Sequence, residues 1–202
     1  MTLSRRLFLA SLAATAVAAP ALADDIPAPD LSQEPFPVKD NENKVEFKYR
    51  RKQMEYNTSE APGTIVVDPK ARFLYYVLGN GQAIRYGASV GKQGRTWSGA
   101  ATIGRMEKWP TWTPTPEHLA EFPKLAKYVP GGMPGGLDNP MGARALYLYQ
   151  GDVDTIYRIH GTYDPSFIGR KKTAGCVSLL NVDIIDLFNR VQLGTKVVVL
   201  EY

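Results

Sequence analysis

The chain has 202 residues, with 24 lysines and arginines against 20 aspartates and glutamates, which gives a formal net charge of +4. This length suits one compact domain and not two. The charge is weak and forms no long basic run, so it does not favour nucleic acid as a partner. The single cysteine, Cys176, excludes an intramolecular disulfide.

The first 23 residues have the pattern of an export signal. Arg5 and Arg6 precede an alanine-rich apolar run, and the small residues 21–23 mark a cleavage site. Residues 4–9 resemble the twin-arginine export signal, with an ordinary Sec signal as the alternative. Removing 1–23 takes away two basic and no acidic residues, which lowers the net charge to +2. We expect a periplasmic protein that has no stable membrane insertion once the signal is removed.

Residues 24–58 are rich in proline and charge and show little apolar periodicity. They are predicted to form a linker or N-terminal extension, of which the last third packs on the domain. The domain itself is then expected to comprise residues 59–202.

From Pro62 onward, short β-branched and aromatic runs alternate with Gly, Pro and Asp, which is typical of strands. One main helix is expected at Val182–Val191 by its apolar spacing, with Asn181 as its N-cap. The fold class is therefore predicted to be mainly β, sandwich or barrel-like, with this helix following Cys176. The expected strands are Thr64–Val67, Phe73–Leu78, Ala83–Val90, Ala145–Tyr149, Thr155–Ile159 and Lys196–Glu201.

The segment Trp109–Pro140 contains several prolines and two glycine pairs, and a short helix is expected at Glu117–Tyr128. A long excursion in a compact domain is typical of a lid or a binding loop. His118 is read as a solvent-facing helical residue, because no second ligand lies at metal-binding spacing, so no metal is expected. Trp97, near a strand end, is a candidate to contact substrate, with core packing as the alternative.

His160 and Cys176, which lie in the same stretch of the sequence, are the candidate catalytic residues. A thiol needs a neighbouring imidazole to become a thiolate nucleophile. If residues 155–160 form a strand, Arg158 shares a face with His160 and can bind an anionic group. The N–H groups of Gly175 and Cys176 are candidates for an oxyanion hole. The alternative interpretation makes Cys176 a small buried hydrophobe and His160 a core histidine.

A multi-part pattern resembles the L,D-transpeptidase catalytic (YkuD) domain over most of residues 62–202. It comprises His160-Gly161, then Thr173, Gly175-Cys176 and Asn181. The runs 109–112, 131–133 and 139–148 resemble a branch of exported proteins from Gram-negative bacteria. The resemblance implies a cysteine acyltransferase without a cofactor that crosslinks peptidoglycan stem peptides, and so acts in cell-wall organization and cell shape.

By this resemblance, Cys176 is the nucleophile and His160 the base, and the other imidazole nitrogen needs an acceptor such as a backbone carbonyl. Gly161, Thr173 and Asn181 are then expected to shape the substrate site.

The sequence departs from the family at a position close to the cysteine. Two residues after the cysteine the family usually has an arginine, whereas this chain has Ser178. Serine cannot form the bidentate carboxylate contact of arginine, so the donor position in the stem stays open. Ser178 itself is a candidate substrate contact, and the missing charge is expected from Lys171, Lys172, Arg158 or Arg144. The alternatives are a carboxypeptidase, a D-amino-acid exchange enzyme, or an inactive wall-binding module of the same fold.

Overall fold

The computed structural model describes residues 26–92, 97–173 and 175–202. The predicted signal peptide, residues 1–23, lies outside the described residues. In the described ranges, no helix combines the length and the apolar character needed to cross a membrane.

Most of the fold is one mixed sheet of nine strands in the order β1-β4-β3-β2-β11-β6-β7-β8-β10, and β5 and β9 form a second, two-stranded sheet. Strand β11 joins the two halves of the large sheet, because it pairs parallel to β2 and antiparallel to β6. The strands are β1 (Lys52–Glu55), β2 (Ile65–Asp68), β3 (Phe73–Gly79), β4 (Gln82–Gly87), β5 (Val90–Gly91), β6 (Gly99–Lys108), β7 (Arg144–Gln150), β8 (Val153–Thr162), β9 (Lys171–Thr173), β10 (Val177–Leu180) and β11 (Lys196–Val199).

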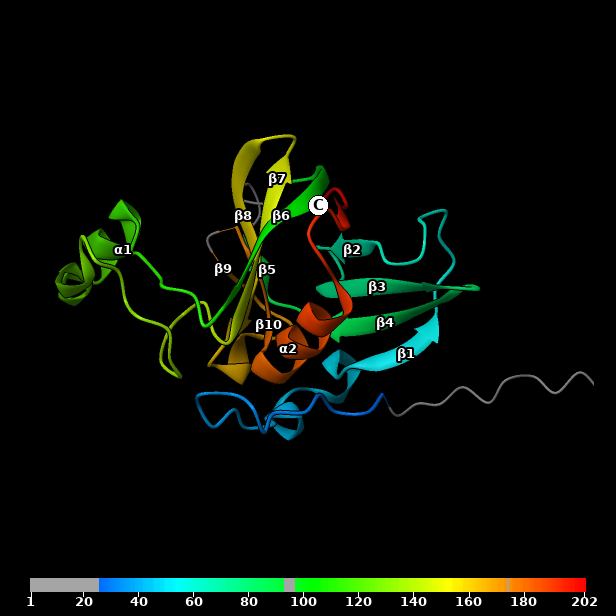
Figure 1. Ribbon diagram of the computed structural model, residues 1–202, viewed down its shortest axis with the longest axis horizontal. Coiled ribbons are helices and arrows are strands. Elements are labelled where there is room, and N and C mark those ends of the chain that lie inside the picture. The colour runs from blue at the N-terminus through cyan, green and yellow to red at the C-terminus, as the bar shows by residue number, and fades with distance from the viewer. Residues whose placement is uncertain (1–25, 93–96, 174) are drawn as a thin grey trace, which may run out of the picture.

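The large sheet bends around the core, so that β1, β3 and β4 run across Figure 1 while β6, β7 and β8 stand upright. Helix α2 (Asn181–Arg190) lies between these two halves. Its Ile184 and Leu187 are fully buried together with Leu74 of β3, Leu146 of β7 and Ile159 of β8. Burial of such side chains stabilises the domain by roughly 1.5–3 kcal/mol each. The predicted class, mainly β with one main helix after Cys176, is confirmed.

The expected strands all appear, with one difference in continuity. The run predicted at 83–90 is divided into β4 and β5, because the chain leaves the large sheet after Gly87. Strands β1, β6, β9 and β10 were not predicted. The expected helix at 117–128 is also divided, into α1 (Pro116–Glu121) and a 3-10 helix, η3 (Pro123–Tyr128), because Pro123 lacks the N–H that would continue α1.

The N-terminal segment packs on the domain over much more than its last third. Strand β1 pairs with β4, and the 3-10 helices η1 (Glu42–Lys44) and η2 (Phe47–Tyr49) precede it. Val45 and Tyr49 are buried in a second apolar cluster with residues of β10 and α2. Residues 26–58 therefore form a packed N-terminal extension and not a free linker, while the predicted domain boundaries stay a prediction.

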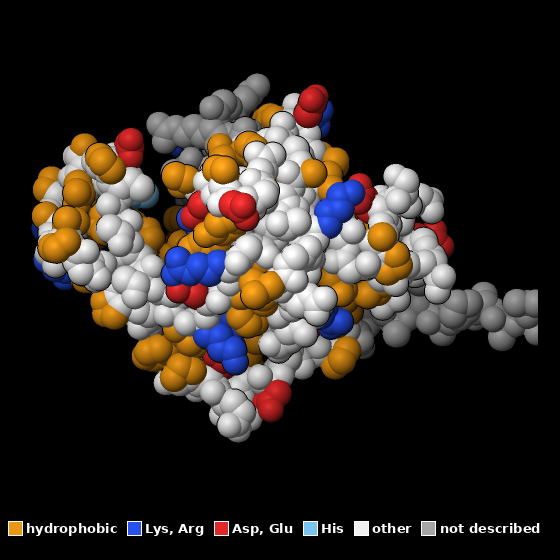
Figure 2. Space-filling view, turned by 45° about the horizontal axis from the view of Figure 1, so that its top comes forward, with side chains coloured by type: hydrophobic (Ala, Val, Ile, Leu, Met, Phe, Trp, Pro, Cys, Tyr) orange, Lys and Arg blue, Asp and Glu red, His pale blue; other side chains and the backbone are white. Residues whose placement is uncertain are grey.

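The segment between β6 and β7 forms an arm that projects from the body (Figure 1). It carries α1 and η3, and Figure 2 shows it as a separate lobe with hydrophobic side chains on its surface. Phe122 and Val129, at the two ends of η3, are 53% and 45% exposed. A further 3-10 helix, η4 (Pro165–Phe167), follows β8.

Candidate active site

His160 lies on β8 and is 8% exposed. Its Nδ1 is 2.7 Å from the carbonyl oxygen of Gly161. Because a carbonyl can only accept, Nδ1 carries the proton and Nε2 holds the lone pair. The predicted backbone acceptor is therefore present. The pKa of His160 is lowered to about 4, chiefly by burial and to a smaller extent by the charge of Arg158, while the hydrogen bond to the Gly161 carbonyl opposes this fall.

Cys176 lies just before β10, after a glycine with φ of 146°, a conformation that side-chain-bearing residues rarely adopt. Burial raises the pKa of the Cys176 thiol, and the backbone N–H and the charge of Arg158 oppose this rise. The pKa shifts of Cys176 and His160 therefore both favour the neutral forms, a thiol and an uncharged imidazole.

The loop before the cysteine is closed by Thr173. Its hydroxyl donates to the carbonyl oxygen of Cys176 and accepts from the N–H of Gly175 at 3.3 Å. Thr173 thus holds the backbone of Gly175 and Cys176. The prediction that the Gly175 N–H belongs to an oxyanion hole is not supported in this conformation, because that donor is directed to the threonine.

The side chain of Asn181 packs against the backbone of residues 142, 143 and 161, close to His160. Its Oδ1 accepts from the N–H of Ala143 at 2.9 Å. A Cβ on Gly142 or Gly161 would lie 2.3 or 2.2 Å from the same oxygen, so both positions require glycine. The predicted N-cap is wrong, because α2 begins at Asn181 itself and Leu180 occupies the cap position without a side-chain bond. The asparagine instead fixes the backbone that presents the Gly161 carbonyl to His160.

Strand register places two rows of side chains on one face of β6, β7, β8 and β10. In the first row, Arg105 is opposite Tyr147 and Tyr147 is opposite Arg158. The second row consists of Glu107, Ala145, His160 and Ser178. The prediction that Arg158 and His160 share a face is confirmed.

Tyr147 is flanked by two guanidinium groups, those of Arg105 and Arg158, each 4.4 Å from the ring centroid. Each arginine also meets a carboxylate: Arg158 binds both oxygens of Asp154, at 2.7 and 2.8 Å, and Arg105 binds Glu107. The two guanidinium groups of the first row are therefore each paired with a carboxylate from outside that row. Sequence reasoning missed Arg105 and Tyr147, because the apolar pattern of β7 indicated only core packing.

A comparison with protein families decides what this site belongs to. The family model described as the L,D-transpeptidase catalytic domain (YkuD) matches residues 62–199, which include the histidine, the cysteine and their supporting residues. The chain belongs to this family.

Individual relatives agree with the assignment. "Probable L,D-transpeptidase ErfK/SrfK" of Escherichia coli is 34% identical over 143 residues, which cover 69% of this chain and 44% of that protein. "Putative L,D-transpeptidase in ATP synthase subunits region ORF 5" of Fuscovulum blasticum is 34% identical over 202 residues and 97% of each chain. The chain thus spans less than half the length of the E. coli relative.

A solved structure is also similar. It is the crystal structure of a Brucella melitensis protein named "Probable carnitine operon oxidoreductase caia", with 46% identity and a TM-score of 0.52. The similarity covers 79% of this chain and 99% of that chain. It supports the fold, whereas the family assignment rests on residues 62–199.

Ser178, where the L,D-transpeptidase family usually has arginine, is not placed as a substrate contact. It is 2% exposed, and its Oγ lies 3.2 Å from Nε2 of His160. The register of β10 against β8 directs the Ser178 hydroxyl to His160, so the structure does not support the predicted substrate contact.

Arg144 is also placed differently from the prediction. Ala145 is the β7 residue opposite His160, so the neighbouring Arg144 lies on the other face of the sheet, over Phe188 of α2. It is 2% exposed, and Glu34 of the extension binds both of its terminal nitrogens. Arg144 therefore does not supply charge to the face of the sheet that carries His160.

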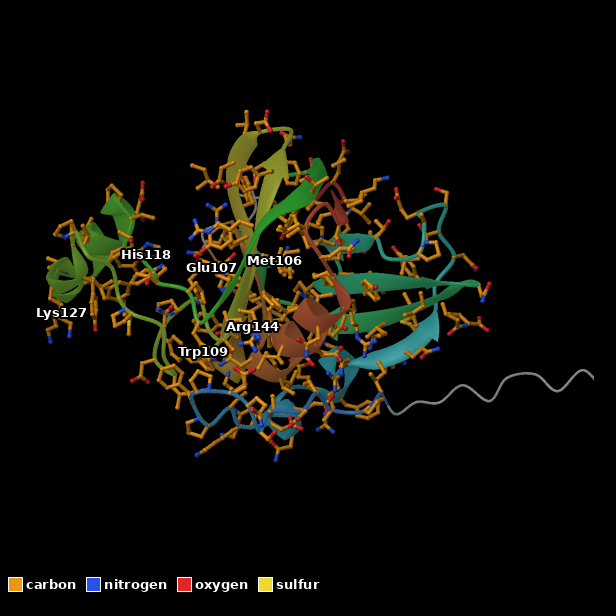
Figure 3. All side chains as sticks on the ribbon, viewed as in Figure 1. Met106, Glu107, Trp109, His118, Lys127 and Arg144 are labelled. Carbon is orange, nitrogen blue, oxygen red and sulfur yellow. The ribbon has the colours of Figure 1, made fainter. Side chains whose placement is uncertain are left out.

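Glu34 is a residue that sequence reasoning missed, because nothing near it in sequence marks its partners. It also accepts from Nε1 of Trp109 at 2.8 Å, and Phe36 meets that indole edge-on. Figure 3 shows Trp109 and Arg144 close together, whereas His118 and Lys127 lie on the projecting arm. His118 shares hydrogen bonds with Thr115 that cap α1.

The other residues predicted to contact substrate or supply charge are Trp97, Lys171 and Lys172. Trp97 lines a small apolar hollow with Tyr157, Arg158 and Gly175, and its ring lies 5.7 Å from that of Tyr157. Its contact with substrate stays a prediction. The Lys171 ammonium lies over the ring of Tyr202, and the side chain of Lys172 is outside what the structure describes.

Proposed function

We propose that the protein is a peptidoglycan L,D-transpeptidase that crosslinks stem peptides through a thioester on Cys176. The proposal is carried by one juxtaposition: strand β10 brings the end of the cysteine loop beside β8, where the buried His160 has its Nδ1 proton bound by the Gly161 carbonyl and its unprotonated Nε2 directed to Ser178 of β10. A neutral imidazole with one nitrogen fixed is suited to general-base catalysis.

In the proposed reaction, the Cys176 sulfur attacks an amide carbonyl of a donor stem peptide and its proton passes to His160. The imidazolium then protonates the leaving amine, so the terminal residue departs and a thioester remains. The amine of a second stem attacks this thioester, and His160 takes its proton. The thiol and the neutral base are restored once that proton returns to sulfur, and the product is a crosslink.

The backbone N–H of Cys176 is the proposed donor to the oxyanion, since the Gly175 N–H is bound by Thr173. Arg158 is the proposed contact for an anionic group of the stem, because it lies on the catalytic face next to the thiol. Gly161, Thr173 and Asn181 support the site by holding its backbone. The donor position in the stem stays open, because Ser178 points to the base and not to substrate.

We further infer that the catalytic domain of residues 59–202 acts in the periplasm, after export directed by residues 1–23. The arginine pair and the apolar run support export, and the twin-arginine route is the one that their pattern favours.

Mass spectrometry tests the proposal directly. The protein and its Cys176→Ala variant are incubated with purified disaccharide-tetrapeptide and tripeptide stems, and both protein mass and products are followed. A Cys176-dependent acyl adduct with crosslinked dimers is expected, and fragmentation of the dimers identifies the donor residue. Hydrolysed or exchanged stems without dimers would instead indicate a carboxypeptidase or an exchange enzyme. An unmodified thiol with bound, unchanged stems would indicate a wall-binding module.

A further inference from the structure

Ser178 has a paired chain segment on each side. On one side it pairs with His160 in the parallel register of β10 and β8. On the other side its N–H and carbonyl exchange hydrogen bonds with Ser89, at 2.9 and 2.8 Å. With both edges of the strand fixed and the side chain buried, the direction of the Ser178 hydroxyl is set by the fold.

The hydrogen bond between Ser178 and His160 has a defined direction. Nδ1 donates to the Gly161 carbonyl, so the neutral ring can only accept at Nε2, and the serine hydroxyl must donate to it. Nε2 is the one nitrogen that can take a proton from the nucleophile. In the part of the chain that the structure describes, this nitrogen is hydrogen bonded to Ser178 and not to the thiol.

Cys176 precedes Ser178 by two positions, immediately before β10 begins at Val177. We propose that Ser178 connects the nucleophile to its base: the thiol proton of Cys176 passes to the serine oxygen while the serine's own proton passes to Nε2 of His160. The products are a thiolate and an imidazolium, and the serine hydroxyl is regenerated. No proton or electron pair is left over.

A hydroxyl is suited to this position because it can donate to the neutral ring and, after rotation, accept from the protonated one. The base therefore keeps a hydrogen-bond partner in both of its states. Arginine, the usual family residue, can only donate and would repel the imidazolium. Alanine would leave a buried nitrogen without a partner, which costs roughly 1–3 kcal/mol.

Cys176 is the only cysteine of the chain, so the mass gained with iodoacetamide reports on that thiol alone. We would measure the alkylation rate between pH 6 and pH 10 for the protein and for Ser178→Ala and Ser178→Thr. The matched control is Ser89→Ala, which removes a buried hydroxyl that donates to the Arg170 carbonyl and not to the base. Thermal unfolding checks that each variant is folded.

The expected result is a rate for Ser178→Ala that is lower by at least about tenfold at pH 7 and converges with the unmodified protein near pH 10. At that pH hydroxide ionises the thiol without the base. Ser178→Thr keeps the hydroxyl and should stay close to the original rate, as should Ser89→Ala. An unchanged rate in Ser178→Ala at pH 7, an equal loss at all pH values, or an equal loss in the threonine or the Ser89 variant would each overturn the proposal.

The inference rests on the proposed function only for the identity of the acyl donor. If the alkylation pattern holds but no stem acylates Cys176, the role of Ser178 stands and the proposed substrate fails. If stems acylate Ser178→Ala as fast as the unmodified protein, the proposed function stands and the connection through Ser178 fails.

Discussion

The side-chain oxygen of Asn181 lies so close to the backbone of Gly161 that a Cβ at position 161 would be 2.2 Å from it. This contact brings the first residue of α2 against the residue whose carbonyl fixes the tautomer of His160. The orientation of the base therefore depends on a packing contact between β8 and the helix that follows the nucleophile.

Gly161→Ala is expected to lower both stability and activity. The added methyl group must displace Asn181 or the Ala143 backbone, and overpacking of this kind costs about 1–3 kcal/mol. Acyl transfer should fall more than stability, because the Gly161 carbonyl moves away from His160. Gly131→Ala is the matched control, since nothing lies within 4 Å of its Cβ position. Chemical denaturation and the acylation assay check this, and unchanged stability in Gly161→Ala would contradict the contact.

Arg158→Gln is expected to slow alkylation of Cys176 at neutral pH. The charge of Arg158 lowers the pKa of the thiol against the effect of burial, so its loss raises that pKa and reduces the thiolate fraction. The same charge lowers the pKa of His160, so that pKa should also rise. Arg105→Gln is the control, because Arg105 contacts the same tyrosine ring from the other side. An equal effect of both variants would show that the local charge of Arg158 is not the cause.

Much of the large sheet could be predicted because its strands carry continuous apolar or alternating patterns, as in β3 and β7. Strand β6 could not, because only Ala101 and Ile103 of its ten residues are buried and the register shifts between Ile103 and Arg105. A shift of this kind interrupts the alternation by which a strand is read from sequence.

The residues of the candidate site could be picked out from the sequence, whereas their geometry was harder to predict. The proposed roles of His160 and Cys176 follow from residue types in a family pattern, and the shared face of Arg158 and His160 follows from alternation along one strand. Placing Arg144 required the register between β7 and β8, which no single sequence contains. The partner of Asn181 is likewise 38 residues away in the chain, so a local capping rule could not find it.

Glu34→Gln is expected to destabilise the protein although it lies in the N-terminal extension. Its carboxylate neutralises the buried Arg144, and leaving such a charge without its partner typically costs about 3 kcal/mol. The extension around Glu34 should also become more sensitive to protease, because Trp109 and Arg144 hold it to the domain. Glu46→Gln is the control, since that carboxylate is half exposed and pairs with the exposed cations Lys48 and Arg170. Equal stability of the two variants would favour a loosely attached extension.

Asp183 on α2 is expected to give the protein a pH-dependent stability. It is 2% exposed, and burial raises its pKa to about 7 even though Arg51 lies 3.7 Å away. Because the folded-state pKa lies above the unfolded one, the folded protein binds the additional proton. The stabilisation is complete below the unfolded pKa and is lost as the pH rises through about 7.

Asp183→Asn resembles the protonated carboxyl at every pH and removes this dependence. The free energy of unfolding of the unmodified protein should therefore fall relative to that of the variant between pH 5 and pH 8. Chemical denaturation across this range measures the difference directly, and His160, which also titrates, cancels because it is present in both proteins. A constant difference across the range would mean that Asp183 is already ionised at pH 5, and that Arg51 outweighs the effect of burial.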